Sequence, residues 1–284
     1  MPPTRSWLFT PATRPERFTK AIEAGADVLI LDLEDAVAPK DKTSARRAAF
    51  DALERARGGC ARALRVNGLD TADGLTDVLA LLESEVAPDF LILPKTESAD
   101  HLLILDRLLA RTGRDIRLVG LIESARGLAA VERIAKATPR LHGLMLGVAD
   151  MAADLGSTSD WSALAHVRGR LIAACALGGI AAIDSPFFDI RDAAGMEREV
   201  RAAVALGFAA KAAIHPNQIS LINTSLTPSE ADVAEARDIL AANEKGVGVV
   251  NGRMIDEAMA RKARRVLAAV SSRDLSLSKE NHNG

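Results

Sequence analysis

Short apolar runs that meet a charged residue recur along the chain. The run Val28–Leu33 leads into Glu34 and Asp35, and four later runs end in or enclose one charge each: Arg65, Lys95, Glu123 and Asp150. Strands buried on both faces of a parallel sheet have this continuously apolar character, so the runs predict parallel strands. Because a buried strand has no reason to finish on a bare charge, the pattern indicates one polar pocket at a common sheet edge. Such a pocket is typical of an enzyme.

Strands of this kind alternate with helices along most of the chain. The predicted strands are Ser6–Thr10, Val28–Leu33, Arg62–Val66, Phe90–Leu93, Arg117–Ile122, Leu144–Val148, Ala181–Ile183 and Ala210–Ile214. The segments between them predict helices at Pro15–Ala24, Lys42–Arg57 and Leu75–Leu82, and near Ser98–Arg111, Gly127–Ala137, Trp161–Leu177 and Asp192–Leu206. This series matches a (β/α)8 TIM barrel in the α/β class. An open doubly wound sheet is the alternative, but it usually has fewer strands, and no GxGxxG follows the first strand.

The character of the chain changes after Leu226. Thr227-Pro228-Ser229-Glu230 is a helix-start signature, and a second helical run covers Ile255–Val270 after a connector rich in Gly, Val and Asn. We therefore expect a barrel at 1–226, a C-terminal helical extension at 227–270 that serves as a lid or in oligomerisation, and a polar, disordered tail at 271–284.

Composition argues against several classes of function. The chain has 36 Lys and Arg against 38 Asp and Glu, and its net charge of −2 offers no attraction to nucleic acid or to an anionic membrane. Aromatic residues make up only 3%, so base-stacking surfaces are not expected. Cys60 and Cys175 stand alone, which argues against disulfides and a cysteine-based zinc site. No apolar run reaches the roughly 18 residues of a membrane span. We expect a soluble, cytoplasmic protein.

Two carboxylates follow neighbouring predicted strands. Glu123 and Asp150 repel each other at close range unless one is protonated or a cation lies between them. Mg²⁺ prefers a few carboxylates with waters and substrate oxygens, and no His or Cys accompanies these acids, so a hard divalent cation is favoured over zinc. The alternative is that Glu123 caps the following helix and Asp150 begins a turn. The spacing alone leaves both interpretations open.

Two strand-end cations suggest contacts with an anionic substrate. The planar guanidinium of Arg65, just before Asn67-Gly68, suits bidentate binding of a carboxylate, although an ion pair with Glu34 or Asp35 is nearly as well supported. Lys95 is a candidate for substrate binding. A Schiff-base role for it is disfavoured, because a lysine among acids stays protonated and is a poor nucleophile; we favour ion pairing.

Three further residues have an ordinary structural interpretation beside a functional one. Arg14 and Arg17, at the first strand–helix junction, suit a phosphate of a large substrate. The alternative, which we favour, is that both arginines lie on a solvated helix face. His215 ends the last strand, where it is either a base or, as we favour, a structural histidine with its hydrogen bonds satisfied.

Taken in order, these segments closely resemble the β subunit of citrate lyase and its relatives in the citrate lyase/2-keto-acid aldolase superfamily. The matching stretches are Ser6-Trp7-Leu8-Phe9-Thr10-Pro11-Ala12, Arg14-Pro15-Glu16-Arg17, Ala24-Gly25-Ala26-Asp27, Leu31-Asp32-Leu33-Glu34-Asp35-Ala36-Val37, Arg65-Val66-Asn67, Leu93-Pro94-Lys95, Ile122-Glu123-Ser124-Ala125-Arg126-Gly127, Gly147-Val148-Ala149-Asp150, Asp184-Ser185-Pro186-Phe187 and Ile214-His215-Pro216. One such motif is weak evidence, but the ordered series over residues 5–220 is specific.

The resemblance implies roles for particular residues. Glu123 and Asp150 correspond to the two Mg²⁺ ligands, and Arg65 to the arginine that binds the carboxylate of the oxo or hydroxy acid. Glu34 and Asp35 correspond to acids that order metal-bound water. The family fold is a (β/α)8 barrel, commonly assembled as a trimer or hexamer.

The C-terminal segment adds one more candidate. Asn251-Gly252-Arg253-Met254-Ile255-Asp256 resembles the lid of malyl- and citramalyl-thioester lyases, in which an aspartate from a neighbouring subunit completes the site. Asp256 is therefore the candidate acid/base. The relatives usually continue with a proline, whereas Glu257-Ala258 follow here. The alternative role for Asp256 is an N-terminal helix charge.

The leading hypothesis is Mg²⁺-dependent, reversible carbon–carbon cleavage of a 3-hydroxyacyl thioester such as citryl-, malyl- or citramalyl-CoA, or the same acyl group on an acyl carrier protein. The products are an acyl thioester and a 2-oxo acid such as oxaloacetate, glyoxylate or pyruvate. Thioester hydrolysis, a malate-synthase-like activity and an aldolase using free pyruvate enolate are alternatives on the same scaffold. A non-catalytic partner subunit is the alternative of another class, although a scaffold has no need to bury polar strand ends.

Overall fold

Eight parallel strands form a closed barrel in the computed structural model, which describes residues 4–14, 16–55, 59–244, 248–250 and 253–280. Each strand pairs with the next, and the last pairs with the first. The strands are β1 (Ser6–Pro11), β2 (Val28–Asp32), β3 (Ala61–Arg65), β4 (Phe90–Leu93), β5 (Arg117–Ile122), β6 (Leu141–Leu146), β7 (Ala181–Asp184) and β8 (Ala210–Ala213). The predicted (β/α)8 TIM barrel is confirmed.

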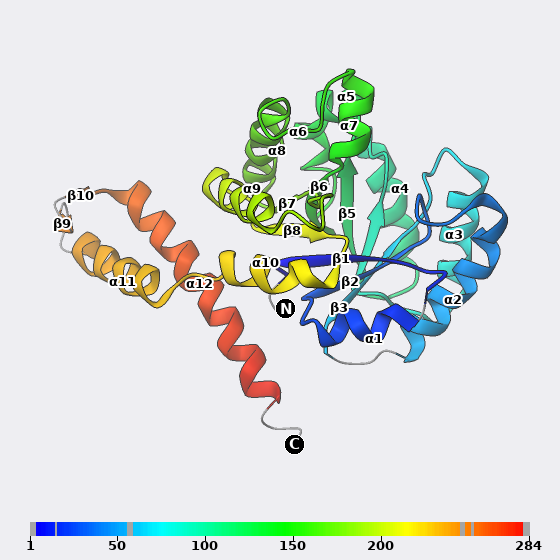
Figure 1. Ribbon diagram of the computed structural model, residues 1–284, viewed down its shortest axis with the longest axis horizontal. Coiled ribbons are helices and arrows are strands. Elements are labelled where there is room, and N and C mark those ends of the chain that lie inside the picture. The colour runs from blue at the N-terminus through cyan, green and yellow to red at the C-terminus, as the bar shows by residue number, and fades with distance from the viewer. Residues whose placement is uncertain (1–3, 15, 56–58, 245–247, 251–252, 281–284) are drawn as a thin grey trace. The chain divides into compact units, whose positions relative to one another are not determined.

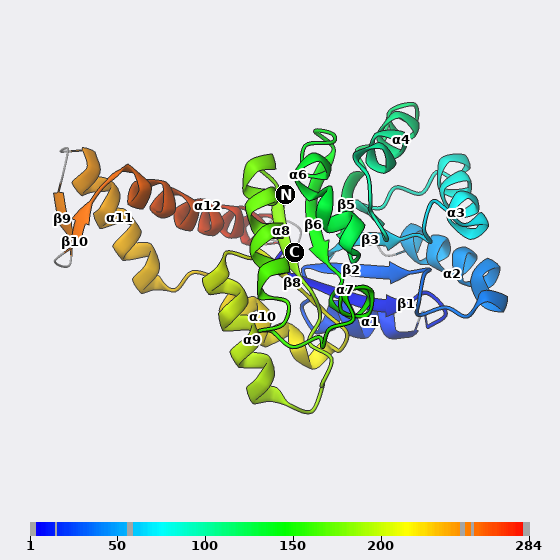
Figure 2. The ribbon, with the colours of Figure 1, turned by 90° about the horizontal axis from the view of Figure 1, so that it is seen from above.

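Helices lie outside the ring of strands and link one strand to the next (Figures 1 and 2). They are α1 (Glu16–Glu23), α2 (Lys42–Arg55), α3 (Ala72–Glu83), α4 (Ala99–Ala110), α5 (Ala125–Ala129), α6 (Val131–Ile134), α7 (Val148–Leu155), α8 (Ala165–Gly178), α9 (Ala193–Leu206) and α10 (Ile219–Ser225). Two 3-10 turns, η1 (Pro39–Asp41) and η2 (Pro216–Gln218), precede α2 and α10. Because the strands are parallel, all the loops that follow them meet at one end of the barrel.

The structure differs most from the sequence prediction on either side of β6. The apolar run Leu144–Ala149 predicted a strand through Val148, but β6 ends at Leu146 and Gly147 becomes the N-cap of helix α7. The helix predicted near Gly127–Ala137 is instead the two short helices α5 and α6. As a consequence, Asp150 lies in the first turn of a helix, and the interpretation that it begins a turn is wrong.

Apolar side chains from every strand fill the barrel interior. Trp7, Phe90 and Ile30 are completely buried there, together with Ala63, Val119 and further strand residues. Trp7 and Phe90 lie near the starts of their strands, with ring centroids 4.8 Å apart, and His142 packs against Phe90 at the same distance. One end of the barrel is therefore sealed by aromatic rings, which leaves the other end for the polar strand termini.

The C-terminal residues form a second compact unit. The barrel unit is Thr4–Ile222, which ends four residues before the end of the predicted barrel domain, 1–226. In the second, α11 (Glu230–Glu244) and α12 (Glu257–Glu280) pack around Ala236, Ile239 and Ile255, and a hairpin of β9 (Gly248–Val250) and β10 (Arg253–Ile255) joins them. Helix α12 continues past residue 270, where the sequence predicted a tail, because no Gly or Pro interrupts it.

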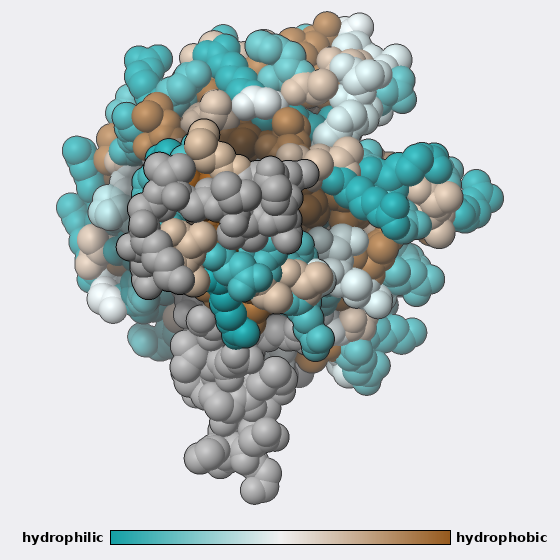
Figure 3. Space-filling view, turned by 90° about the vertical axis from the view of Figure 1, so that its left-hand side faces the viewer, coloured by the Kyte–Doolittle hydropathy of each residue, from teal (hydrophilic) through white to brown (hydrophobic). Residues whose placement is uncertain are grey.

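The outer surface is mixed in character. Figure 3 shows hydrophilic side chains over much of the face that it presents, with smaller hydrophobic groups among them. Within the described residues, none of the helices has the length and apolar content that a bilayer crossing requires.

Candidate active site

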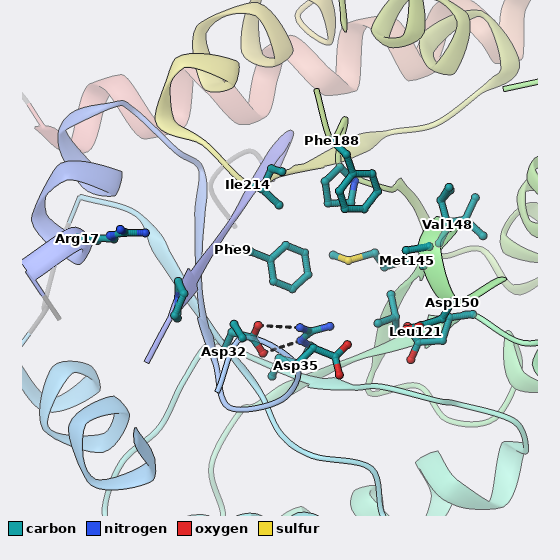
Figure 4. Close-up of a pocket in the computed structure, with 18 residues that line it drawn as sticks. Phe9, Arg17, Asp32, Asp35, Leu121, Met145, Val148, Asp150, Phe188 and Ile214 are labelled. Atoms are coloured by element: carbon teal, nitrogen blue, oxygen red, sulfur yellow. Dashed lines mark hydrogen bonds and ion pairs between the residues drawn. The ribbon is translucent and has the colours of Figure 1, made fainter. Parts of the chain in front are cut away.

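A cavity of ≈ 410 Å³ opens at the end of the barrel where the strands finish (Figure 4). Its polar lining consists of Arg17, Asp32, Asp35, Arg65, Glu123 and Asp150. Its apolar lining includes Phe9, Leu121, Met145, Val148, Phe188 and Ile214. Figure 4 shows Asp32, Asp35 and Asp150 on one side of Phe9 and Met145, with Ile214 and Phe188 on the other side. The cavity therefore has a charged side and an apolar side.

Glu123 is buried directly after β5, and its side chain is fixed from two directions. Its Oε1 accepts a hydrogen bond of 2.7 Å from the Lys95 backbone N–H. Its Oε2 lies so close to Gly147 that a Cβ there would be 2.6 Å from this oxygen. The following helix is capped by the Ser124 hydroxyl, which accepts from the Gly127 N–H, so the interpretation of Glu123 as the cap is wrong.

Burial and neighbouring acids strongly disfavour the charged form of Glu123. Desolvation, with smaller contributions from the charges of Glu34 and Asp150, raises the pKa of Glu123 to about 8. The Lys95 amide and the charge of Arg65 act in the opposite direction but do not compensate. A cation beside Glu123 and Asp150 would restore the charged form, because an opposite charge at short range favours the carboxylate.

The residues that are present fit Mg²⁺. Glu123 and Asp150 line one cavity, and the residues around it, as far as the structure describes them, include no His or Cys. Their donors are therefore oxygens, as a hard cation requires. In the described part of the chain no group of three or more His, Cys, Asp or Glu side chains is arranged to hold a metal ion, so a cation here would rely on Glu123 and Asp150 together with waters and substrate oxygens. Mg²⁺ usually keeps several waters and substrate oxygens, and two carboxylates suffice for it.

Arg65 is held at the end of β3 by two acids. Its Nε and Nη2 donate to the two carboxylate oxygens of Asp32, at 2.7 Å each, and the dashed lines at Asp32 in Figure 4 mark these bonds. Its Nη1 lies 2.9 Å from Glu34 Oε2. The guanidinium also lies 4.8 Å from the centre of the Phe9 ring. Burial acts to lower the pKa of Arg65, but the charge of Asp32 and its hydrogen bonds outweigh burial and raise it. Since a guanidinium has five N–H donors, these contacts do not use all of them, and Arg65 lines the cavity.

Glu34 contacts both Arg65 and Lys95. Lys95 Nζ donates to Glu34 Oε1 at 2.7 Å, while Glu34 itself is buried. Desolvation raises the pKa of Glu34 even though Arg65 and Lys95 lie beside it. Burial lowers the pKa of Lys95, but the hydrogen bond to Glu34 outweighs it and raises that pKa. Neither residue is part of the cavity lining, whereas Asp35 is.

Of the other predicted residues, Arg14 and His215 do not line the cavity. Arg14 is 60% exposed, lies 3.8 Å from Glu16 and is not on the cavity, in contrast to Arg17. His215 Nδ1 accepts a hydrogen bond from the Asn217 N–H and caps a 3-10 turn. This contact agrees with the interpretation of His215 as a structural histidine. Asp256 belongs to the C-terminal unit, where its Oδ1 accepts from the Met259 N–H at the start of α12. Asn251 and Gly252 lie outside the described residues.

Asp184, the last residue of β7, and Lys211, its partner on β8, lie in a cluster outside the cavity. Lys211 Nζ donates to Asp184, to Glu199 and to the Ser185 carbonyl, and Arg168 also donates to Asp184. These contacts tie β7 and β8 to helices α8 and α9. They also fix the start of the loop that carries Phe188 to the cavity.

Sequence reasoning missed Asp32 and Lys42. Asp32 is the acid inside the run Val28–Leu33, and this interruption was the available signal. Lys42, at the start of α2, donates to the carbonyls of Leu33 and Glu34 and to the Asn67 side chain, at 2.8, 2.7 and 2.6 Å. All three N–H groups of its ammonium are therefore used to fix the ends of β2 and β3.

The chain matches the family model described as "HpcH/HpaI aldolase/citrate lyase" over residues 5–216, which is the whole barrel. The chain belongs to the HpcH/HpaI aldolase/citrate lyase family. Among curated relatives, the L-malyl-CoA/beta-methylmalyl-CoA lyase of Rhodobacter capsulatus is 40% identical, over 91% of this chain and 92% of the relative. The citrate lyase subunit beta-like protein of Mycobacterium tuberculosis is 39% identical, over 88% and 89%. The predictions of the family and of a lyase enzyme are confirmed.

Solved structures of the HpcH/HpaI aldolase/citrate lyase family agree with this assignment. RipC from Yersinia pestis is 55% identical, with a TM-score of 0.73 over 81% of this chain and 98% of RipC. CitE from Mycobacterium tuberculosis, crystallised with magnesium, acetoacetate and coenzyme A, is 35% identical, with a TM-score of 0.77 over 95% of this chain and 98% of CitE. Another CitE structure contains oxaloacetate and magnesium.

Proposed function

We propose that this protein cleaves, reversibly and with Mg²⁺, a 3-hydroxyacyl thioester of the malyl, citramalyl or citryl type into a 2-oxo acid and an acyl thioester. The observation that carries the proposal is the meeting of Glu123, Asp150 and Arg65 in one cavity. Two carboxylates suit a hard cation, and a buried guanidinium beside them suits the carboxylate of the same substrate. The magnesium, oxo acids and coenzyme A found with the CitE relatives support this substrate class.

The size of the cavity bears on where the thioester carrier lies. A volume of ≈ 410 Å³ is near the lower end of the range of about 300–1,000 Å³ for small-molecule sites. It has room for a short hydroxy diacid, but not for a nucleotide carrier as well. The carrier, coenzyme A or an acyl carrier protein, would therefore lie outside the cavity. Arg17, which lines the cavity and is its one cation besides Arg65 among the described residues, is the candidate for contact with the carrier's phosphates.

In this reaction Glu123 and Asp150 would hold the cation, and Arg65 would bind and orient the carboxylate next to the reacting carbon. Mg²⁺ at this point would supply Lewis-acid chemistry, lowering the pKa of the substrate hydroxyl. Asp256 is the proposed acceptor of the hydroxyl proton. The C–C bond then breaks, its electron pair passing to the thioester as an enolate and leaving the 2-oxo acid. The apolar side of the cavity, with Phe9 and Met145, accommodates the hydrocarbon part of the substrate.

Product analysis tests the proposal. Purified protein with Mg²⁺ is incubated with malyl-, citramalyl- and citryl-thioesters, and the products are identified by mass spectrometry. A lyase releases the 2-oxo acid and the shorter acyl thioester in equal amounts. Release of the intact hydroxy acid with free thiol would instead establish a hydrolase, and no turnover of any thioester would support a non-catalytic subunit.

Asp256 is tested separately from the metal site. Asp256→Asn keeps the shape of the side chain and a hydrogen-bond acceptor for the Met259 N–H, but it removes the base. We expect kcat to fall by about 10²–10⁴-fold, the usual contribution of general base catalysis, with Mg²⁺ affinity unchanged. Unchanged kcat would assign the proton transfer to another group and leave Asp256 as a helix cap.

A further inference from the structure

Lys95 adopts a backbone conformation that is uncommon for non-glycine residues. Its φ is +48°, and it is the one non-glycine residue with positive φ in the described part of the chain. A Cβ is disfavoured in this left-handed region, so residues are found there where the surrounding structure holds them and where function uses the geometry. The sequence supplies neither Gly nor Asn at this position, although both adopt the conformation readily.

The left-handed turn directs the Lys95 amide to Glu123. The N–H donates to Glu123 Oε1 at 2.7 Å, and the next amide, of Thr96, donates to the Leu121 carbonyl on β5 at 3.1 Å. A Cβ at Gly127 would lie 2.8 Å from the Thr96 carbonyl, so the loop also packs tightly against the start of α5. With Oε1 occupied, the second oxygen of Glu123 remains on the side of Gly147 and the cavity.

The side chain of Lys95 has a different contact. Its Nζ lies 2.7 Å from Glu34 Oε1, and the other oxygen of Glu34 lies 2.9 Å from Arg65 Nη1. The Lys95 side chain is 48% exposed, whereas that of Glu34 is only 5% exposed. The ammonium therefore holds a buried acid that in turn contacts the guanidinium on the cavity.

We propose that Lys95 is a positioning residue with two separable functions. Its backbone amide fixes the orientation of Glu123 for the cation, and its ammonium fixes Glu34, and through it Arg65, for the carboxylate of the oxo acid. This inference rests on the proposed function. It assigns metal affinity to the backbone of Lys95 and oxo-acid affinity to its side chain.

Substitutions that all remove the ammonium separate these two functions. Lys95→Gly and Lys95→Asn tolerate the left-handed conformation, whereas Lys95→Val, which is β-branched, does not. Calorimetry with MgCl₂ in the presence of oxaloacetate measures the cation, and titration of oxaloacetate at saturating Mg²⁺ measures the oxo acid. We expect the Gly and Asn variants to bind Mg²⁺ within about threefold of the wild type and the Val variant about tenfold or more weakly. All three variants should bind oxaloacetate more weakly than the wild type, by a similar factor.

Equal Mg²⁺ affinity of the Val and Gly variants would overturn the backbone function, and unchanged oxaloacetate affinity in all three would overturn the side-chain function. If Lys95→Val does not fold, Lys95→Ala, with a smaller side chain, replaces it with a weaker effect in the same direction. Hydrogen exchange of the residue-95 amide gives a readout without metal: it should be protected in the Gly and Asn variants and exposed in the Val variant. A wild-type protein that binds no Mg²⁺ would refute the proposed function. The hydrogen-exchange measurement would still test the backbone function of Lys95, and equal exchange of the residue-95 amide in the Gly and Val variants would refute it.

Discussion

The two ends of the barrel differ in what they bury. At the end where the strands start, the rings of Trp7, Phe90 and His142 pack against one another in tilted pairs, with centroids 4.8 to 6.0 Å apart. At the end where the strands finish, Glu34, Arg65 and Glu123 are buried together beside a cavity. The first arrangement removes apolar surface from water and stabilises the fold, whereas the second retains charges whose desolvation opposes folding. The difference indicates that one end serves stability and the other chemistry, as is general for this fold.

Replacing a carboxylate at the end where the strands finish should have the largest effect on catalysis and little on folding. We expect Glu123→Ala or Asp150→Ala to lower kcat/KM by about 10³-fold or more, since metal and electrostatic contributions of this kind are worth several kcal/mol. The midpoint of thermal unfolding should stay the same or rise for Glu123→Ala, because a buried acid whose charged form is desolvated is removed. Glu83→Ala changes an exposed acid on α3 that does not line the cavity, and it should keep the wild-type kcat/KM. Loss of activity in this control as well would mean that the effect does not depend on the two cavity acids.

Truncation of an aromatic ring at the end where the strands start should lower stability and leave catalysis unchanged. Phe90 is completely buried between Trp7 and His142. Phe90→Ala should therefore reduce the free energy of unfolding by about 3–5 kcal/mol, as measured by urea denaturation. At low temperature the folded fraction should keep the wild-type kcat/KM. A Phe90→Ala protein that is stable but inactive would contradict the assignment of stability to one end of the barrel and chemistry to the other.

His142 should make the stability of this aromatic end depend on pH. Desolvation, with a smaller contribution from the charge of Arg117, lowers the pKa of His142 to about 4. Its Nε2 is buried without a hydrogen-bond partner, so the fold requires the neutral ring. A folded-state pKa below the unfolded value of about 6.5 means that this stabilisation is present above that value and is lost as the pH falls towards 4.

The size of the effect is roughly 2 kcal/mol between pH 7.5 and pH 5. Urea denaturation of the wild type and of His142→Phe at both pH values measures it, and the difference between the two proteins removes the contribution of the acids at the other end. His166→Asn changes an exposed histidine and should retain the wild-type dependence. The interpretation fails if His142→Phe has the same pH dependence as the wild type.

Gly147 gives the smallest and most specific test of the cavity end. A Cβ at this position would lie 2.6 Å from both Cβ and Oε2 of Glu123, so Gly147→Ala has to displace that side chain. We expect about tenfold weaker Mg²⁺ binding in calorimetry with a correctly folded protein. Gly156→Ala is not a suitable control, because Gly156 has a φ of +63°, but Gly169→Ala lies in open space on α8 and should bind Mg²⁺ as the wild type does.

The strands could be predicted from the sequence because burial on both faces gives each one a continuous apolar run. The charged residues at the strand ends could also be recognised, because each one stands out against an apolar run. The structure brings Glu123, Asp150 and Arg65 to one cavity, as their order along the chain suggested. Asp32 was overlooked because it interrupts such a run instead of ending it. The apolar run through Leu144–Ala149 was read as one strand, although Gly147 divides it into a strand and a helix.

Other features depend on contacts between distant segments. The ammonium of Lys42 is near in sequence only to Leu33 and Glu34, and its third partner, Asn67, is brought to it by the pairing of β2 with β3. The positive φ of Lys95 has no local signal, since it is imposed by bonds to β5 and its following loop. The role of Asp256 also stays a prediction.

The central claim is that Glu123 and Asp150 together hold a divalent cation beside Arg65. Crystals grown with Mn²⁺ and oxaloacetate would test it directly, because manganese scatters anomalously and can take the oxygen ligands of magnesium. We predict a single strong anomalous peak bonded to one carboxylate oxygen of each acid, with an oxaloacetate carboxylate against the Arg65 guanidinium. A manganese peak bonded to neither acid, with oxaloacetate ordered elsewhere, would contradict the account.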